Sequence, residues 1–173
     1  RFGKLVWRGG LVLSSNSPHF GGWSGLEMSA DGGEMLAISD AGTWMRARLT
    51  YAGAAPRSVD KAVLGPLRGR DGRVLARRRD RDAEGLALVS GTIKGGEVFV
   101  SFEGNHRIGL YPVIAAGLGT PTRNLLPPKD LKRGKRDGLE ALTVLAGGPN
   151  RGALVGFAEE ANADTGLHAG WIW

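Results

Sequence analysis

Six carboxylates recur at similar positions in three acidic motifs, and their residue types suit a metal site. They are Glu27, Asp40, Glu84, Glu103, Glu140 and Glu159. Carboxylates held close together repel one another, which raises their pKa values unless a cation lies among them. Hard cations such as Ca²⁺ take six to eight oxygen ligands, many of them from carboxylates. The set therefore predicts a calcium site.

The same acids have a structural alternative. Each carboxylate could accept hydrogen bonds from backbone N–H groups of a neighbouring structural unit and fix the packing of that unit. Because one carboxylate has two oxygens, the metal role and the packing role are compatible. The residues alone leave both open.

A second polar group follows the fourth acid directly. Asn105, His106 and Arg107 come two to four residues after Glu103. An imidazole can transfer protons near neutral pH, and a guanidinium binds phosphate or carboxylate oxygens in pairs. We predict that His106 and Arg107 are catalytic residues at the mouth of a channel, where they hold a leaving oxyanion. The alternative is a polar hairpin turn with a surface histidine.

A repeat of about 56 residues must position these groups, with units near 22–53, 82–115 and 137–173. Each unit holds an acidic residue beside a Gly-Leu pair, a glycine-rich turn and an apolar run that a second acid closes. Two apolar runs around a glycine turn predict a β-hairpin. Residues 44–51 and 107–113 predict a further strand, as do residues 3–13. Residues 54–81 and 116–136 are rich in Pro, Gly and basic residues and predict long loops.

Short strands in repeated units are typical of a β-propeller, whose innermost strands line a central channel. The fold class expected is therefore all-β and β-propeller-like, with about three blades in a single domain over residues 1–173. Closed propellers have 4–8 blades, so we expect about half of a roughly six-bladed propeller. Open blade edges favour pairing with another chain, and we expect a homo-oligomer.

Composition narrows the function classes. The chain has 29 glycines and no cysteine, which indicates many tight turns and excludes disulfides, thiol catalysis and cysteine-based zinc sites. No apolar run is long enough to predict a membrane span. The net charge is +6, and basic residues gather in 68–81 and 129–136. These runs lack interleaved aromatic residues, so nucleic acid is not an expected partner.

Several motifs together resemble a known family, the phytase-like family of bacterial proteins, which is distantly similar to β-propeller phytases. The motifs lie at 22–28, 37–42, 82–87, 100–108 and 137–142. The resemblance implies a propeller whose acidic channel binds calcium and hydrolyses a small-molecule phosphate ester or carboxylate ester. It also implies a periplasmic or secreted protein. The alternative is a non-catalytic β-propeller that serves as a binding or scaffold protein.

Overall fold

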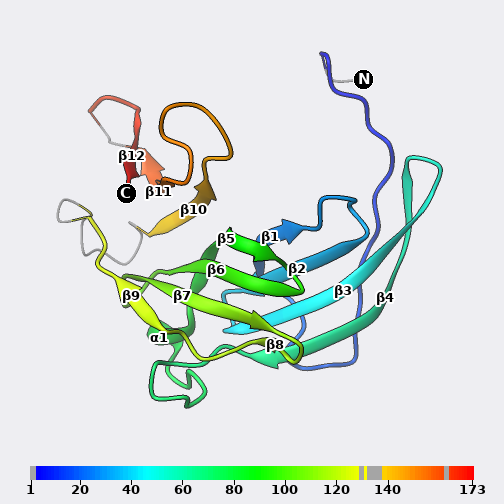
Figure 1. Cartoon of the computed structure of the whole chain (residues 1–173), viewed down its shortest axis with the longest axis horizontal. Coiled ribbons are helices and arrows are strands. Elements are labelled where there is room, and N and C mark those ends of the chain that lie inside the picture. Colours follow the sequence, from blue (N-terminus) through cyan, green and yellow to red (C-terminus); the bar gives the residue numbers. More distant parts are fainter. Residues whose placement is uncertain (1–2, 129–130, 132–137, 162–163) are drawn as a thin grey trace.

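The computed structural model describes residues 3–128, 131, 138–161 and 164–173. Within them, twelve β-strands form three antiparallel sheets, and a helix of four residues is the only helix (Figure 1). That helix, the only one among the described residues, is far too short to cross a lipid bilayer. The predicted all-β class is confirmed.

We call the three sheets blades 1, 2 and 3. Blade 1 consists, in spatial order, of β1 (Trp23–Met28), β2 (Glu34–Ser39), β3 (Thr43–Ala52) and β4 (Ala55–Pro66). The short helix α1 (Arg78–Arg81) leads into blade 2, which holds β5 (Ala83–Thr92), β6 (Gly95–Phe102), β7 (Arg107–Ile114) and β8 (Gly117–Leu118), with β9 (Arg123–Leu125) also paired to β7. Blade 3 consists of β10 (Leu139–Val144), β11 (Leu154–Ala161) and β12 (His168–Ile172).

The first strand of each blade is the innermost one. Strand β5 contacts β1 on one side and β10 on the other, as Figure 1 shows near the centre of the molecule. One buried core joins Leu36 and Trp44 of blade 1 to Leu86 of blade 2, and a second joins Phe99 of blade 2 to Leu154 of blade 3. Sheets packed face to face around their first strands are the arrangement of a partial propeller, which confirms the predicted architecture. The extent of the domain, residues 1–173, stays a prediction.

The predicted loop over residues 54–81 is wrong in its first half. Residues Ala55–Pro66 form β4, which pairs with β3 at the edge of blade 1. Proline lacks an N–H and is tolerated on edge strands, so Pro56 and Pro66 do not prevent pairing. Residues 116–136 likewise contain β8 and β9. In contrast, the strands predicted over 44–51 and 107–113 correspond to β3 and β7.

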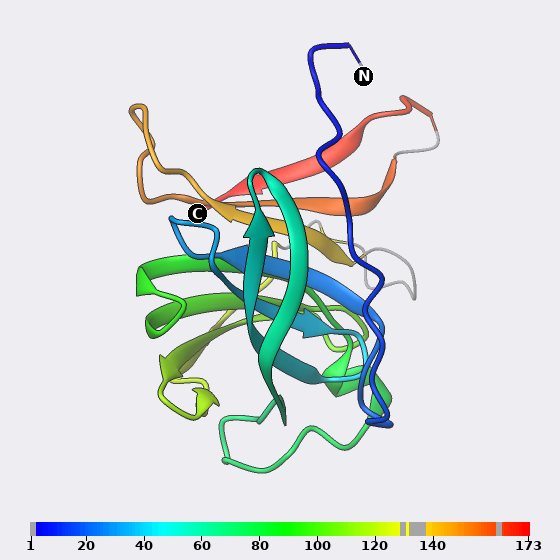
Figure 2. The same ribbon diagram turned by 90° about the vertical axis from the view of Figure 1, so that its right-hand side faces the viewer.

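The strand predicted over residues 3–13 does not join any of the three sheets. Figure 2 shows this segment as an extended trace outside the sheets, and its apolar side chains Leu5, Trp7 and Val12 are exposed. The basic run of 129–136 lies outside the described residues apart from Leu131, which is buried. Asp137, the first residue of the third predicted motif, also lies outside the described residues.

Candidate metal centre

A β-bulge near the start of each innermost strand sets the position of the key side chains. The bulge falls at Ser24 in β1, at Glu84 and Gly85 in β5, and at Glu140 in β10. In a bulge, two residues oppose one residue of the partner strand, so the strand bends and a side chain is redirected. Two of the predicted acids, Glu84 and Glu140, therefore occupy equivalent positions in neighbouring blades.

The acids that close the second strand also share one backbone arrangement. The N–H groups of Asp40, Glu103 and Glu159 donate to the carbonyls of the residues two before each bulge, over 3.0, 2.8 and 3.2 Å. Those carbonyls belong to Gly22, Asp82 and Gly138. Because the same bond recurs in every blade, the three closing acids lie at the same end of the innermost strands as the bulges.

Carboxylates from all three blades converge at this end of the strands. We call the following group the carboxylate cluster: Asp40, Asp82, Glu84, Glu103, Glu140 and Glu159. Oxygen atoms of Asp82, Glu84 and Glu103 lie within 4.8 Å of one another, and all three side chains are half-buried. Oxygens that surround a calcium ion at 2.3–2.6 Å lie at most roughly 5 Å apart, so the spacing of these three suits one cation.

Glu84 shows the electrostatic strain of this arrangement. Partial burial raises its pKa to about 7, and the neighbouring charges of Glu140, Asp82 and Asp40 add to the rise. A hydrogen bond from Ser24 acts in the opposite direction. Burial and like charge both disfavour the ionised form. A cation between the carboxylates would remove that cost.

Glu140 repeats the pattern in blade 3. Burial raises its pKa to about 7, and Glu159, Glu103 and Asp82 contribute further repulsion. Burial also raises the pKa of Asp82, whereas the positive charge of Arg78 in α1 lowers it. The cluster is thus a single electrostatic unit that spans the blades.

Comparison with known proteins assigns the chain to a family. Residues 18–171 match the family described as "Phytase-like: Esterase-like activity of phytase". The chain belongs to the phytase-like family. This confirms the resemblance drawn from the motifs.

Among solved structures, the chain is similar to the β-propeller domain of Cps50 (Swd1) from Myceliophteria thermophila, with a TM-score of 0.47 and 17% sequence identity. The match covers 86% of this chain and 36% of that one, so the phytase-like chain spans little more than a third of that neighbour. A search of curated proteins found no match.

Glu27 lies elsewhere in the phytase-like chain. Its Oε1 accepts a hydrogen bond of 2.8 Å from the backbone N–H of Leu88 in β5, so it joins blade 1 to blade 2. The predicted equivalence of Glu27 with Glu84 and Glu140 is wrong, because Ser24 occupies the bulge in β1. A role of Glu27 as a metal ligand stays a prediction.

Small residues let the blades approach closely enough to bring the acids together. A Cβ atom on Gly85 would lie 2.9 Å from Cγ of Leu142 in the next blade, which is too close for any larger residue. Buried Ser101 accepts a hydrogen bond from Gly85 N–H at 2.8 Å and donates one to the Leu139 carbonyl at 2.7 Å. This serine thus fixes the β5 bulge against the innermost strand of blade 3.

The predicted catalytic pair sits in the turn between β6 and β7. His106 is half-buried at the end of this turn. Arg107 donates to the carbonyls of Asp80 and Asn105 and lies 3.7 Å above the ring of Phe102. Burial lowers the pKa of its guanidinium. Arg107 therefore holds α1 to the turn, and the catalytic roles of both residues remain predictions.

Sequence reasoning missed two members of the site. Asp82 belongs to the cluster although only Glu84 was singled out from its Asp-Ala-Glu motif. Ser24 holds the bulge position of blade 1 and bonds to Glu84. The Asp-x-Glu spacing could have pointed to Asp82, since alternate strand residues share a face. Nothing in the sequence marks Ser24 as the equivalent of two glutamates.

Proposed function

We propose that this phytase-like protein is a calcium-dependent hydrolase that acts on carboxylate or phosphate esters, with the carboxylate cluster as its metal centre. The observation that carries the proposal is the convergence of Asp82, Glu84 and Glu103 within 4.8 Å, beside acids of both neighbouring blades. At such a site calcium supplies Lewis-acid polarisation of an ester oxygen.

The donor set supports calcium over softer metals. The three closest ligands are all carboxylates, and oxygen-only sites favour Ca²⁺, Mg²⁺ or Mn²⁺, whereas zinc and copper favour nitrogen and sulfur. Asp82, Glu84 and Glu103 would hold the ion, while Glu140 adds negative charge from blade 3. The raised pKa values of Glu84 and Glu140 express a repulsion that a bound cation would relieve.

Positive groups beside the cluster favour an anionic substrate. Arg78 and Arg81 of α1 both interact electrostatically with Asp82. In this proposal His106 and Arg107 hold the leaving oxyanion, because their turn begins at Glu103. Since Arg107 also bonds to the carbonyl of Asp80, its replacement must be followed by a stability measurement as well as by an activity assay.

Calcium titration by calorimetry, combined with thermal melting in calcium and in chelator, tests the metal centre. Binding should raise the melting temperature, because a ligand that binds only the folded state stabilises it. Hydrolysis of 4-nitrophenyl acetate and 4-nitrophenyl phosphate should then require calcium. The proposal fails if calcium neither binds nor shifts the melting temperature.

A non-catalytic binding or scaffold propeller is the second candidate, and the Glu27–Leu88 hydrogen bond favours it. That bond shows that at least one acid of the repeat serves blade packing. Calcium binding without turnover of any ester would support this function over hydrolysis.

Localisation and assembly follow from the same proposal. A calcium site of modest affinity fits a periplasmic or secreted protein, since extracellular calcium modules bind at about 10⁻⁴–10⁻³ M. We expect copies to associate through the outward faces of blades 1 and 3, where Leu26 and Phe157 are exposed. Light scattering and cell fractionation test these two expectations.

A further inference from the structure

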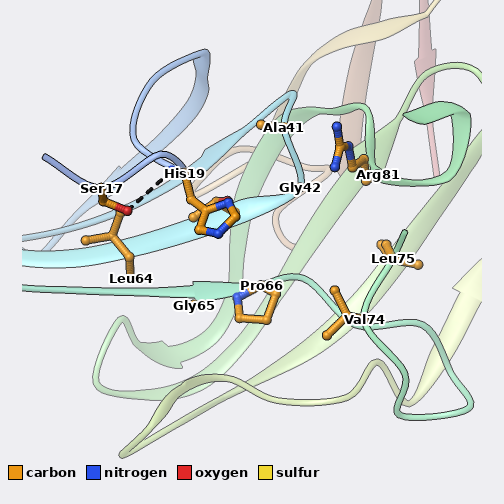
Figure 3. Close-up of a pocket in the computed structure, with 11 residues that line it drawn as sticks. Ser17, His19, Ala41, Gly42, Leu64, Gly65, Pro66, Val74, Leu75 and Arg81 are labelled. Atoms are coloured by element: carbon orange, nitrogen blue, oxygen red, sulfur yellow. Dashed lines mark hydrogen bonds between the residues drawn. The ribbon is translucent and has the colours of Figure 1, made fainter. Parts of the chain in front are cut away.

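A cavity of about 390 Å³ lies beside the carboxylate cluster, on the blade 1 side. Four segments line it: the chain before β1, the turn between β2 and β3, the end of β4, and the stretch from residue 74 to α1 (Figure 3). Binding pockets for small molecules have about this volume. None of the predicted site residues lines this cavity.

Two lining residues are direct chain neighbours of cluster acids. Ala41 follows Asp40, and Arg81 precedes Asp82. Asp40 and Asp82 themselves interact electrostatically. The cavity therefore lies next to the backbone that carries two of the cluster acids.

The lining combines an apolar wall with a cationic group. Leu64, Pro66, Val74 and Leu75 supply the apolar side chains, and Figure 3 shows Arg81 and His19 on opposite sides of the cavity. Such a lining suits a molecule with an apolar body and one anionic group, because apolar surface gains from burial and a guanidinium pairs with oxyanions. A polyol that carries many phosphates would leave the apolar wall unsatisfied.

Arg81 has a buried N–H group, at Nε, without a hydrogen-bond acceptor among the described residues. A Cβ atom on Gly42 would lie 2.6 Å from Cβ of Arg81, and Gly42 has a φ of +75°, so glycine is what leaves room for the arginine. A buried N–H without a partner is costly, and this N–H reaches a ligand oxygen in the cavity only when the Arg81 side chain turns towards it.

We propose that this cavity binds the apolar alcohol group of a phosphate monoester and that Arg81 binds an oxygen of its phosphate. The favoured substrate class is therefore an aryl or alkyl phosphate, not a polyphosphorylated polyol. This inference rests on the proposed hydrolase function for its substrate role, but the binding site can be tested without turnover.

Two phosphonates, whose P–C bond is not hydrolysed, separate the contribution of apolar surface to binding from the contribution of charge. With calcium present, phenylphosphonate should bind about tenfold or more tightly than methylphosphonate by calorimetry, because the ring gains the free energy of burial. Equal affinities for the two probes would overturn the proposal.

Matched variants locate the binding. Val74 and Val63 are both 49% exposed, but only Val74 lines the cavity. Val74→Trp should abolish the phenylphosphonate advantage, whereas Val63→Trp should keep it. Arg81→Gln should weaken both phosphonates about tenfold or more, whereas Arg70→Gln, at an exposed arginine outside the cavity, should leave them unchanged. An advantage that survives Val74→Trp in a folded variant would overturn the proposal.

The outcomes also separate this inference from the proposed function. If phenylphosphonate binds in the cavity and no ester is hydrolysed, the site stands and the hydrolase function falls. If phenyl phosphate is hydrolysed with calcium, but Val74→Trp and Arg81→Gln leave kcat/KM unchanged, the function stands and the cavity is not its substrate site.

Discussion

The innermost strands of blades 1 and 2 have the same backbone arrangement, but their acidic side chains have different roles. Both have a bulge at the same place, and both bond to the closing acid of the second strand. In β5 the bulge carries Glu84, which faces other carboxylates. In β1 it carries Ser24, and the acid of that strand, Glu27, lies three residues further on and bonds to Leu88 of the neighbouring blade.

The difference shows that position along the strand decides the role of an acid. At the bulge a side chain is turned towards the common end of the blades, where Glu84 meets other acids and Ser24. Beyond the bulge a carboxylate faces the next blade, where it can accept a backbone N–H. The two roles that the sequence left open, metal ligand and packing group, thus suit different acids.

The largest effect is expected when the bulge acids of blades 2 and 3 lose their charge. The double variant Glu84→Gln, Glu140→Gln should lose calcium binding and with it the calcium-dependent stabilisation, about 2.7 kcal/mol at a calcium concentration of 100 times Kd. Thermal melting with and without calcium measures this. Glu160→Gln, an exposed neighbour of Glu159, is the control. A double variant that binds calcium like the wild type would remove the bulge acids from the metal centre.

Replacement of Ser101 tests how the β5 bulge is held. Ser101→Ala leaves the N–H of Gly85 and the carbonyl of Leu139 without their partner, which should lower the free energy of unfolding by about 2 kcal/mol. Urea unfolding measures the change. Blade 1 has Ile38 at the equivalent position opposite its bulge, so the device is particular to blade 2. The exposed Ser90→Ala variant should change stability little, and an equal loss there would refute the assignment.

A smaller effect is expected at Glu27. Glu27→Ala should lower the free energy of unfolding by about 1 kcal/mol through the lost bond to Leu88, whereas Glu27→Gln keeps an acceptor oxygen and should lose less. Calcium affinity, measured by calorimetry, should stay the same in both variants. A loss of calcium affinity similar to that of the Glu84 variant would instead make Glu27 a ligand and blur the contrast between the two strands.

Much of the fold could be predicted from the sequence because its signals are local. Alternating and apolar runs around glycine turns mark the hairpins, and β3 and β7 followed from the same pattern. The closing acids Asp40, Glu103 and Glu159 were aligned correctly: Asp40 and Glu103 directly follow the second strand of their hairpins, and Glu159 lies near the end of its strand. Their convergence across three blades followed only from the fold.

The errors have physical causes. The letters Gly-Leu-Glu occur both at 25–27 and at 138–140, but Gly25 pairs as Ala141 does, three residues later in the motif. Strand pairing sets the register, so similar letters in the two motifs concealed a shift of three residues. The cavity was missed for a different reason: its lining comes from segments that meet only in the folded chain, and His19 and Arg81 are 62 positions apart.

The last expected effect concerns pH, and it isolates the repulsion among the bulge acids. The pKa values of Glu84 and Glu140 are about 7 in the folded chain, above the usual 4.5. The folded chain therefore holds more protons than the unfolded one between these values, so this contribution to stability is present below pH 4.5 and is lost as the pH rises through 7. In chelator, the melting temperature of the wild type should fall over this range relative to that of the double Gln variant. With calcium present, the melting temperatures of the wild type and the double Gln variant should change with pH in the same way, because the cation replaces the protons. The contrary result is a wild-type melting temperature that rises with pH relative to that of the variant. It would mean that groups of the protein itself stabilise the carboxylates as anions. The acid of β5 would then not differ from the acid of β1 through charge repulsion.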